Sequence, residues 1–472
     1  MSSAVVVGSG PNGLAAAVHL AGNGVSVRVL EAADTIGGGC RSSELTLPGL
    51  LHDDCSAIHP LAVASPFLAG LGLEAEGLRW LWPRVQLAHV LDGGREAVLW
   101  KDTARTAEGL GADGPAWDGL VGRVARGFGP LLDDLLGPHL RVPSHPVRFA
   151  RFGLDAVLPA SAVVRRWRGD EARALFGGLA AHAFARLDAP FTASVGLVLG
   201  ASAHAVGWPI AQGGSRAITD ALAARLRALG GTIETGRRVT SLEELDGADV
   251  AMLDLAPGAA ARLLGPRQPR RTAAAYRRYR HGPAAYKVDF AVEGGIPWRS
   301  EHAREAGTVH VGGTFEEIAA AEADTVRGRM PERPFVLVGQ QYLDDPGRSR
   351  GGIHPVWAYA HVPHAYAGDA TEALIAQIER FAPGFRGRIR ATAVRGPAAL
   401  EAHNANYVGG DIGTGANDGF QLLARPRLTA DPYATGVPGA WLCSAATPPG
   451  AGAHGMPGYR AAAAALAWLA RR

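Results

Sequence analysis

The sequence predicts an α/β fold in which a parallel-sheet domain is interrupted by an inserted α+β domain. Near the N-terminus, a β-branched strand, a glycine-rich turn, an alanine-rich helix and a second strand follow one another within residues 4–30. Helix and strand patterns of this kind return after residue 210 and at the C-terminus, while a hairpin, several helices and further strands occupy the chain between them. Strands joined through helices are typical of a parallel sheet with helices on its faces.

The first turn has the spacing G-x-G-x-x-G and lies between the first strand and the helix. Gly8 permits the sharp turn, Gly10 lets the backbone approach a pyrophosphate, and Gly13 lets the helix pack closely on the strand. The second strand ends in Glu31, near the position expected of an acid that binds an adenosine ribose. A Rossmann-like dinucleotide site is therefore predicted, and a glycine turn in another α/β unit is the alternative. The predicted site residues are Gly8, Gly10, Pro11, Asn12, Gly13 and Glu31.

Composition excludes several classes of protein. The 472 residues are 47% hydrophobic and 19% charged, as in an ordinary folded globule, and the net charge of +3 gives no support for nucleic-acid binding. Cys40, Cys55 and Cys443 lack C-x-x-C spacing, so neither a disulfide framework nor a metal site is expected. Because no signal-peptide pattern precedes the first strand and no apolar stretch is long enough to span a bilayer, a soluble, cytoplasmic protein is expected.

One segment suggests contact with a membrane surface. Residues 270–281 carry five arginines together with Tyr276 and Tyr279 on a predicted helix. A basic, aromatic helix can lie on an anionic membrane, although such a charge run is more often a solvated face. Peripheral membrane contact and a solvated surface are the two interpretations.

A second glycine cluster follows the ribose acid. Gly37 and Gly38 precede Arg41, so more backbone and one guanidinium would lie against the same pyrophosphate. Together, G-x-G-x-x-G, a strand ending in Glu and then G-G-x-x-R resemble the flavoprotein superfamily of amine oxidases and phytoene (carotenoid) desaturases. Its phytoene-desaturase-related branch, which includes the pyridine-nucleotide-disulfide oxidoreductase-like proteins, is the most similar. The resemblance implies a Rossmann-like FAD-binding domain of the glutathione-reductase type, with Arg41 in the position of a phosphate-contacting arginine.

The resemblance also places a segment beside the flavin ring. In the superfamily, the stretch that matches residues 50–60 passes next to the isoalloxazine, which would put Ser56 and His59 near the flavin. The equal alternative is a turn capped by Asp53 and Asp54, with His59 packed against the proline that follows it.

Two later segments are assigned to the same cofactor by the resemblance. Residues 212–239 match a second FAD-binding segment, in which Ser215 caps a helix and Val239 meets the adenine. The C-terminal strand, loop and helix match the segment that binds the flavin end, where the helix N-terminus near Gly458 would face the pyrimidine. G-x-G-x-x-G recurs at residues 450–455, but too few residues follow it for a second nucleotide fold. The residues assigned to this end are Thr447, Gly455, Met456 and Gly458.

Two discontinuous domains follow from these assignments. Residues 1–72, 210–262 and 415–472 are expected to form the FAD-binding domain, and residues 73–209 and 263–414 the substrate-binding domain. A single dinucleotide fingerprint leaves no dedicated NAD(P)H domain, so electrons are expected to come from an organic substrate.

The inserted domain is expected to cover the flavin. Its helices are predicted at 117–136, 170–186 and 192–205, and the polar segment 401–411 is expected to border the cavity. Five aromatic residues suit an apolar pocket, although core packing explains them equally: Trp167, Phe176, Phe184, Phe191 and Trp208.

The resemblance implies hydride transfer from an apolar organic substrate to flavin N5, as in a desaturase or dehydrogenase. Oxidation of an alcohol or amine would also need a proton acceptor, for which His59 and His454 are the candidates; His454 could instead hold its own loop. A redox-neutral isomerase or a saturase using reduced FAD on a lipid or isoprenoid is one alternative, and a non-catalytic binding protein on the same scaffold is another. The substrate, the final electron acceptor and the oligomeric state are left open.

Overall fold

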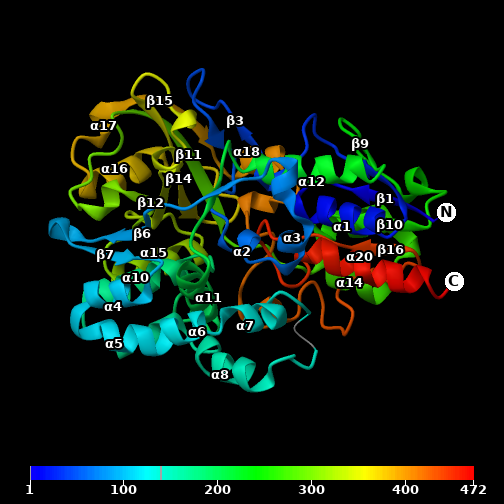
Figure 1. Ribbon diagram of the computed structural model, residues 1–472, viewed down its shortest axis with the longest axis horizontal. Helices are drawn as coiled ribbons and strands as arrows, with labels where there is room; N and C mark the ends of the chain where they lie inside the picture. The colour runs from blue at the N-terminus through cyan, green and yellow to red at the C-terminus, as the bar shows by residue number, and fades with distance from the viewer. Residues whose placement is uncertain (1, 139–140) are drawn as a thin grey trace.

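The computed structural model describes residues 2–138 and 141–472, and its two large sheets lie side by side (Figure 1). The first sheet is five-stranded and parallel, in the order β16-β10-β1-β2-β9. Most of its apolar side chains are buried, as expected of a parallel sheet that lies between helices. The strands are β1 (Ser3–Val7), β2 (Ser26–Leu30), β9 (Thr232–Glu234), β10 (Val250–Leu253) and β16 (Ala440–Leu442).

Helices cover both faces of this sheet. Alternate side chains of β1, such as Val6, pack with α1 (Pro11–Gly22), α12 (Arg216–Ala228) and α20 (Met456–Leu469). The intervening side chains pack with α13 (Pro257–Leu264) and α14 (Arg270–Arg277) on the other face. The predicted α/β fold class is confirmed, and all five strands come from the segments predicted for the FAD-binding domain. The exact domain boundaries stay a prediction.

The second sheet is seven-stranded, in the order β15-β11-β14-β13-β12-β6-β7, and only its β12–β6 pair is parallel. One face packs against α16 (Thr371–Phe381), while the other faces α10, α11 and the space beside the first sheet. The hairpin β6–β7 confirms the one that the sequence predicts. The strands are β6 (Val85–Val90), β7 (Glu96–Leu99), β11 (Ala284–Glu293), β12 (Ala306–Val311), β13 (Val336–Gly339), β14 (Ile353–Val362) and β15 (Ile389–Arg395).

A group of helices between β7 and the return to the first sheet forms the lower part of the molecule in Figure 1. Two of them, α10 (Asp170–Ala181) and α11 (Thr192–Ala205), agree with the predicted positions. The single helix predicted over 117–136 is wrong, because Gly127 leaves helical geometry and a new helix begins at Phe128. The remaining helices of this group are α4 (Thr103–Gly109), α5 (Gly114–Trp117), α6 (Arg123–Ala125), α7 (Phe128–Leu135), α8 (Pro146–Ala156) and α9 (Ala160–Val163).

Short elements complete the chain. The helices are α2 (Pro60–Val63), α3 (Pro66–Leu71), α15 (Phe315–Val326), α17 (Phe385–Arg388), α18 (Pro397–His403) and α19 (Gly419–Leu423). The strands β3 (Ser42–Ser43) and β4 (His52–Asp53) pair with each other, as do β5 (Trp80–Leu81) and β8 (Ile210–Ala211).

The basic helix α14 places its aromatic residues inside the protein. Tyr276 packs in the core beneath the first sheet, and Tyr279 is also buried. The helix therefore presents arginines without the exposed aromatic anchors that the membrane interpretation requires. Across residues 2–138 and 141–472, none of the helices combines the length and the apolar character needed to traverse a bilayer. Peripheral membrane contact stays a prediction.

Candidate cofactor and substrate site

A cavity of about 550 Å³ begins at the carboxyl ends of β1, β2 and β10 and extends to the second sheet. Its volume lies in the usual range of ligand pockets, roughly 300–1,000 Å³. Ligands of open α/β sheets bind at the carboxyl ends of the strands, which is where the predicted glycine turn lies. We call the part beside the first sheet the dinucleotide end and the part beside the second sheet the substrate end.

The glycine turn at the dinucleotide end leaves no space for side chains. Gly8 has a φ of +102°, and its N–H donates to the carbonyl of Leu30 at 2.8 Å. A Cβ at Gly13 would lie 2.1 Å from the carbonyl oxygen of Gly8, and one at Gly10 would lie 2.9 Å from Oδ2 of Asp254. Glycine is therefore required at positions 8 and 13, and a side chain at position 10 would have to displace the carboxylate of Asp254. Gly8, Gly10, Pro11 and Asn12 line the cavity, whereas Gly13 lies behind the turn.

Glu31 lies beside this turn and is held by it. Its carboxylate accepts hydrogen bonds from Ser9 N at 2.8 Å, Ser9 Oγ at 2.6 Å and Ala33 N at 2.8 Å. Glu31 lines the cavity together with Val239, Arg237 and Arg238. The predicted ribose acid and the predicted adenine segment thus lie at the same end of the cavity.

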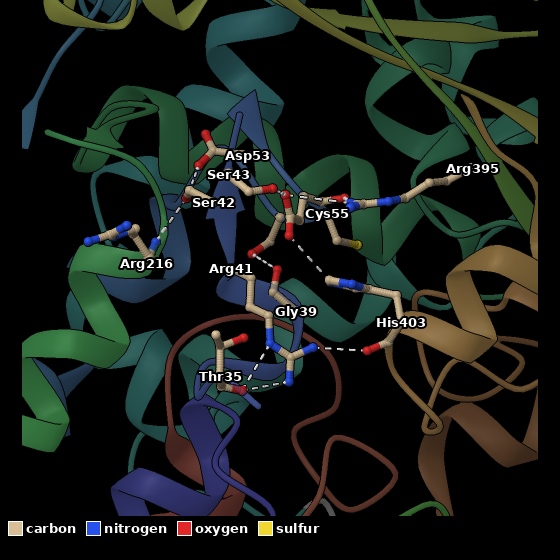
Figure 2. Close-up of polar contacts among 12 residues, drawn as sticks. Thr35, Gly39, Arg41, Ser42, Ser43, Asp53, Cys55, Arg216, Arg395 and His403 are labelled. Carbon is tan, nitrogen blue, oxygen red and sulfur yellow. Dashed lines mark hydrogen bonds and ion pairs between the residues drawn. The ribbon is translucent and has the colours of Figure 1, made fainter. Parts of the chain in front are cut away.

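Arg41 ties together three segments that surround the dinucleotide end. Its guanidinium donates to the carbonyls of Thr35, Ile36 and His403 (Figure 2). The Nη2–O distance to Thr35 is 3.0 Å, and the Nη1–O distance to His403 is 2.9 Å. It also lies 3.6 Å from the carboxylate of Glu31. Arg41 lines the cavity, but most of its N–H groups are already used by the protein. Its contact with the pyrophosphate stays a prediction.

The second glycine cluster touches the first. Gly37 and Gly38 both have positive φ, at +117° and +55°. A Cβ at Gly38 would lie 3.0 Å from the Cα of Gly10, so the two glycine segments approach each other without side chains between them. Gly38 lines the cavity, whereas Gly37 does not.

Ser56 lines the cavity, but His59 does not. The hydroxyl of Ser215 donates to the carbonyl of Ser56 at 2.6 Å, so its oxygen accepts a hydrogen bond from His59 Nε2 at 2.8 Å. Burial lowers the pKa of His59 to about 4. The prediction of His59 as a proton acceptor at the flavin is therefore wrong, because the ring is occupied inside the protein. Ser215 likewise does not cap α12, because its side chain faces Ser56 and His59.

His454 holds the C-terminal loop. Its Nδ1 accepts the N–H of Met456 at 3.2 Å, at the first residue of α20, and burial lowers its pKa to about 4. The ring does not line the cavity, so the prediction of His454 as a proton acceptor is wrong and the alternative, a loop-holding role, agrees with the structure.

The C-terminal helix begins behind the cavity wall. A Cβ at Gly458 would lie 1.8 Å from the carbonyl oxygen of Asn12, so the first turn of α20 packs directly on α1. Thr447 is buried, and its hydroxyl donates to Ser444 O. The four residues predicted to line the flavin end therefore lie outside the cavity surface: Thr447, Gly455, Met456 and Gly458. The preceding loop supplies the lining instead, with Ser444, Ala445, Ala451, Gly452 and Ala453.

Asp254 is a site residue that the motif analysis missed. It follows β10 directly and lines the cavity, and its Oδ2 accepts the N–H of Gly13 at 3.0 Å. Burial raises the pKa of this carboxyl to about 7; the Gly13 hydrogen bond opposes the rise and the charge of Glu31 adds to it. The sequence pattern that could have identified Asp254 is an acid directly after a buried strand of a dinucleotide fold.

Side chains from many elements form the substrate end. His182, which ends α10, reaches the cavity, and its Nε2 lies 3.2 Å from Nε2 of His310 on β12. Burial lowers the pKa of His182 to about 3. Of the five aromatic residues expected here, only Trp208 lines the cavity; Trp167 and Phe176 are core residues. The other lining residues of this end include Leu199, Thr308, Leu337, Trp357 and Tyr359.

The polar segment 401–411 borders the cavity, as predicted, through residues 402–407. Asn406 fixes this segment to the first sheet, because its side chain accepts from Ala256 N at 2.7 Å and donates to the carbonyl of Asp254 at 2.9 Å. The segment thus adjoins the dinucleotide end next to Asp254.

Comparison with known proteins agrees with this geometry. Residues 6–66 match the family described as an NAD(P)-binding Rossmann-like domain. The chain is 25% identical to the pyridine nucleotide-disulfide oxidoreductase domain-containing protein 2 of Rattus norvegicus, over 97% of this chain and 92% of the relative. A putrescine oxidase bound to putrescine superposes with a TM-score of 0.63 at 18% identity, covering 99% of both chains. The chain has the fold of the amine oxidases.

A second solved enzyme has the same fold. The cyclohexylamine oxidase of Brevibacterium oxydans also superposes over 100% of both chains, with a TM-score of 0.57 at 15% identity. The rat relative carries the name of the branch that the glycine and arginine motifs resemble.

The residues of the dinucleotide end fit the predicted cofactor, FAD. The cavity wall there is a cradle of glycines that any Cβ would fill, as the approach distances at Gly10 and Gly38 show. The buried amide oxygen Oδ1 of Asn12 has no hydrogen-bond partner among the described residues. A turn at the N-terminus of a helix, an acid after the second strand and an unpartnered amide are features expected of a dinucleotide site.

Proposed function

We propose that this protein is an FAD-dependent oxidoreductase that removes a hydride from a neutral, largely apolar organic substrate. The observation that carries the proposal is one continuous cavity, with the glycine turn and Glu31 at one end and an aromatic wall at the other. Its residues would hold the ADP half of FAD at the dinucleotide end, which leaves the substrate end for the flavin ring and the substrate. When bound, FAD supplies the hydride-accepting chemistry, and the protein supplies orientation and a dry, apolar environment.

The charge of the substrate is inferred from the acids that line the cavity. Within the described part of the chain, the acidic lining residues are Glu31 and Asp254, and both lie at the dinucleotide end. The substrate end presents Leu199, Trp357 and Tyr359 instead. An ammonium group would be buried there without a carboxylate partner, which is costly. A neutral substrate avoids that cost.

His182 is the proton acceptor of this proposal for a substrate such as an alcohol, whose O–H proton has to leave together with the hydride. It lines the substrate end and is neutral at physiological pH, because burial lowers its pKa to about 3. Its pairing with His310 fixes the orientation of the ring. Desaturation of a hydrocarbon also releases a proton, but the carbocation left by hydride loss is acidic enough to give that proton to water. Replacement of His182 should therefore slow oxidation of an alcohol more than desaturation, which distinguishes the two substrate types.

The test combines identification of the flavin with an anaerobic substrate screen. The purified protein is expected to carry FAD, identified by absorbance and by mass after release. Neutral alcohols and hydrocarbons are then compared with primary amines for their ability to bleach the bound flavin without oxygen. Faster bleaching by protonated amines would contradict the neutral-substrate inference.

Two results would favour the other functions. Turnover only after prior reduction of the flavin indicates an isomerase if the flavin stays reduced, and a saturase if the flavin is oxidised as the substrate is reduced. A protein that folds but does not bind added FAD contradicts the enzyme proposal and favours a binding protein on this scaffold. Gly387→Val is a suitable control for loss of FAD during purification of a variant, because Gly387 is exposed and a Cβ there would meet no atom within 4 Å.

A further inference from the structure

An acid from another segment, Asp254, already contacts the anion-binding turn of this protein. The N-terminus of α1 directs its free N–H groups toward the position of the cofactor phosphates, as in other dinucleotide folds. Asp254 occupies part of that position, because its Oδ2 accepts the N–H of Gly13 and lies 2.9 Å from where a Cβ of Gly10 would be. Asp254 also lines the cavity. One helix N-terminus would therefore serve a carboxyl group and a pyrophosphate together.

The groups around Asp254 do not neutralise it. The β1–α1 turn contributes only backbone, and the end of β2 contributes Glu31, a second acid. Arg41, Arg237 and Arg238 are the arginines that line this end, and Arg41 is engaged with Glu31 and with main-chain carbonyls. On the β16 side lies the buried thiol of Cys443, whose pKa is raised above its usual range by burial and by the charge of Asp254. From the segment 404–407, Asn406 donates to the backbone of Asp254 and not to its carboxylate.

We propose that Asp254 is a cofactor-binding residue that takes up a proton when FAD binds, so that this protein binds FAD more weakly as the pH rises. The proposal rests on FAD being the cofactor. A carboxylate and a pyrophosphate in one buried turn repel each other, and like charges at a shared site favour the protonated acid. The protonated carboxyl keeps one oxygen to accept the Gly13 N–H and gains an O–H that can donate to a phosphate oxygen.

The direction of the pH effect follows from linkage. In the free protein the pKa of Asp254 is about 7, so the carboxyl is ionised above that pH and protonated below it. The added phosphate charge raises the pKa further in the complex. At pH values where the Asp254 carboxyl is ionised in the free protein and protonated in the complex, one proton is bound with each FAD. The affinity for FAD then falls by up to about tenfold per pH unit. Below about pH 6 both forms are protonated and affinity is constant with pH.

The experiment titrates the full-length apoprotein with FAD at several pH values and measures proton uptake. The dissociation constant is expected to rise by about tenfold or more between about pH 6 and pH 8.5. Calorimetry at about pH 8 in buffers of different ionisation enthalpy is expected to show uptake of close to one proton per FAD. Asp254→Asn keeps an oxygen for Gly13 and cannot ionise, so its affinity is expected to be independent of pH and tighter than that of the wild type at about pH 8.5.

Asp220→Asn is the matched control, because Asp220 is an exposed acid on α12. This substitution is expected to leave the pH dependence of FAD binding as it is in the wild type. Wild-type protein that binds FAD equally well across this range, with no proton uptake, would overturn the proposal and leave the FAD assignment intact. An Asp254→Asn protein that binds FAD more weakly at every pH would also overturn it, because that result indicates a purely structural role. Failure of the wild type to bind FAD at any pH would overturn both this proposal and the proposed function.

Discussion

The two ends of the cavity are built in different ways. At the dinucleotide end, the residues that face the ligand come from short continuous stretches, such as 8–12 and 38–41, and much of the surface is main chain. At the substrate end, each of His182, Trp208 and Trp357 comes from a different part of the chain. The first end depends on backbone geometry, whereas the second depends on which side chains two sheets and a group of helices bring together.

This difference has a functional consequence. A backbone site binds the constant part of a cofactor and tolerates few changes, because any added Cβ collides with it. A side-chain site can change its specificity with single substitutions while the fold stays the same. We therefore expect substitutions at the dinucleotide end to remove the cofactor and substitutions at the substrate end to change the reaction with the cofactor still bound.

The largest effect is expected from Gly10→Val. Its Cβ would lie 2.9 Å from Asp254 Oδ2, and its γ-carbons would enter the phosphate position. Overpacking of about 1–3 kcal/mol predicts FAD binding weaker by about a hundredfold, so the protein should purify without visible flavin absorbance. Gly387→Val should stay yellow, because its site is open. A yellow Gly10→Val protein would contradict the placement of the pyrophosphate.

His182→Gln should produce the opposite pattern, with FAD retained and chemistry slowed. Loss of a general base predicts anaerobic flavin reduction slower by about 10²- to 10⁴-fold with an alcohol substrate, whose proton leaves together with the hydride. Because the pKa of His182 is about 3, the wild-type rate should not fall between about pH 8 and pH 5, whereas an unshifted histidine would protonate near about 6.5. The measurement is single-turnover flavin bleaching. His59→Gln is the control, and equal slowing in both variants would argue against His182.

Arg41→Lys tests whether Arg41 supports FAD binding by holding main-chain carbonyls in place. Lysine keeps the charge but cannot bridge the carbonyls of Thr35, Ile36 and His403. Loss of hydrogen bonds to a charged group predicts FAD binding weaker by about tenfold and a lower Tm of the apoprotein. Arg216→Lys, on the exposed side of α12, should change neither quantity. A change in FAD affinity with an unchanged Tm would instead indicate direct phosphate contact.

The smallest effect concerns stability without cofactor. Burial raises the pKa of Asp254 from 3.8 to about 7, so the folded protein binds a proton that the unfolded chain has already released. This group therefore lowers the stability of the wild-type apoprotein progressively as the pH rises from about 4 to about 7. Asp254→Asn should show a Tm higher by a few degrees at about pH 8 and similar to the wild type at about pH 4. Thermal unfolding followed by circular dichroism measures this, and a lower Tm at both pH values would contradict it.

Elements with a strong local signal were predicted well. The strand β1 and the helix α11 coincide with expected positions, because strand and helix periodicity act over neighbouring residues. The broken helix over 117–136 was missed, since apolar periodicity continues across Gly127 although the backbone does not. Interruptions of this kind depend on how the flanking helices pack.

Candidate side chains were predicted less well than candidate loops. Ser56 and His59 lie in the same loop, yet only Ser56 faces the cavity, because His59 is hydrogen-bonded to Ser215 from a distant helix. His454 and Gly458 follow shortly after residues that line the cavity. His454 nevertheless faces the start of α20, and Gly458 packs on α1. The sequence does not show which way a loop residue points when its partner comes from another segment.

By itself, the sequence determined the parallel-sheet domain, the glycine turn and Glu31, because each depends on residues that are close together in the chain. Only the tertiary structure decided that Asp254 lies beside that turn and that His182 faces the other end of the cavity. The physical reason is that backbone conformation follows from local sterics, whereas the charge and shape of a cavity follow from side chains that packing brings together from distant segments.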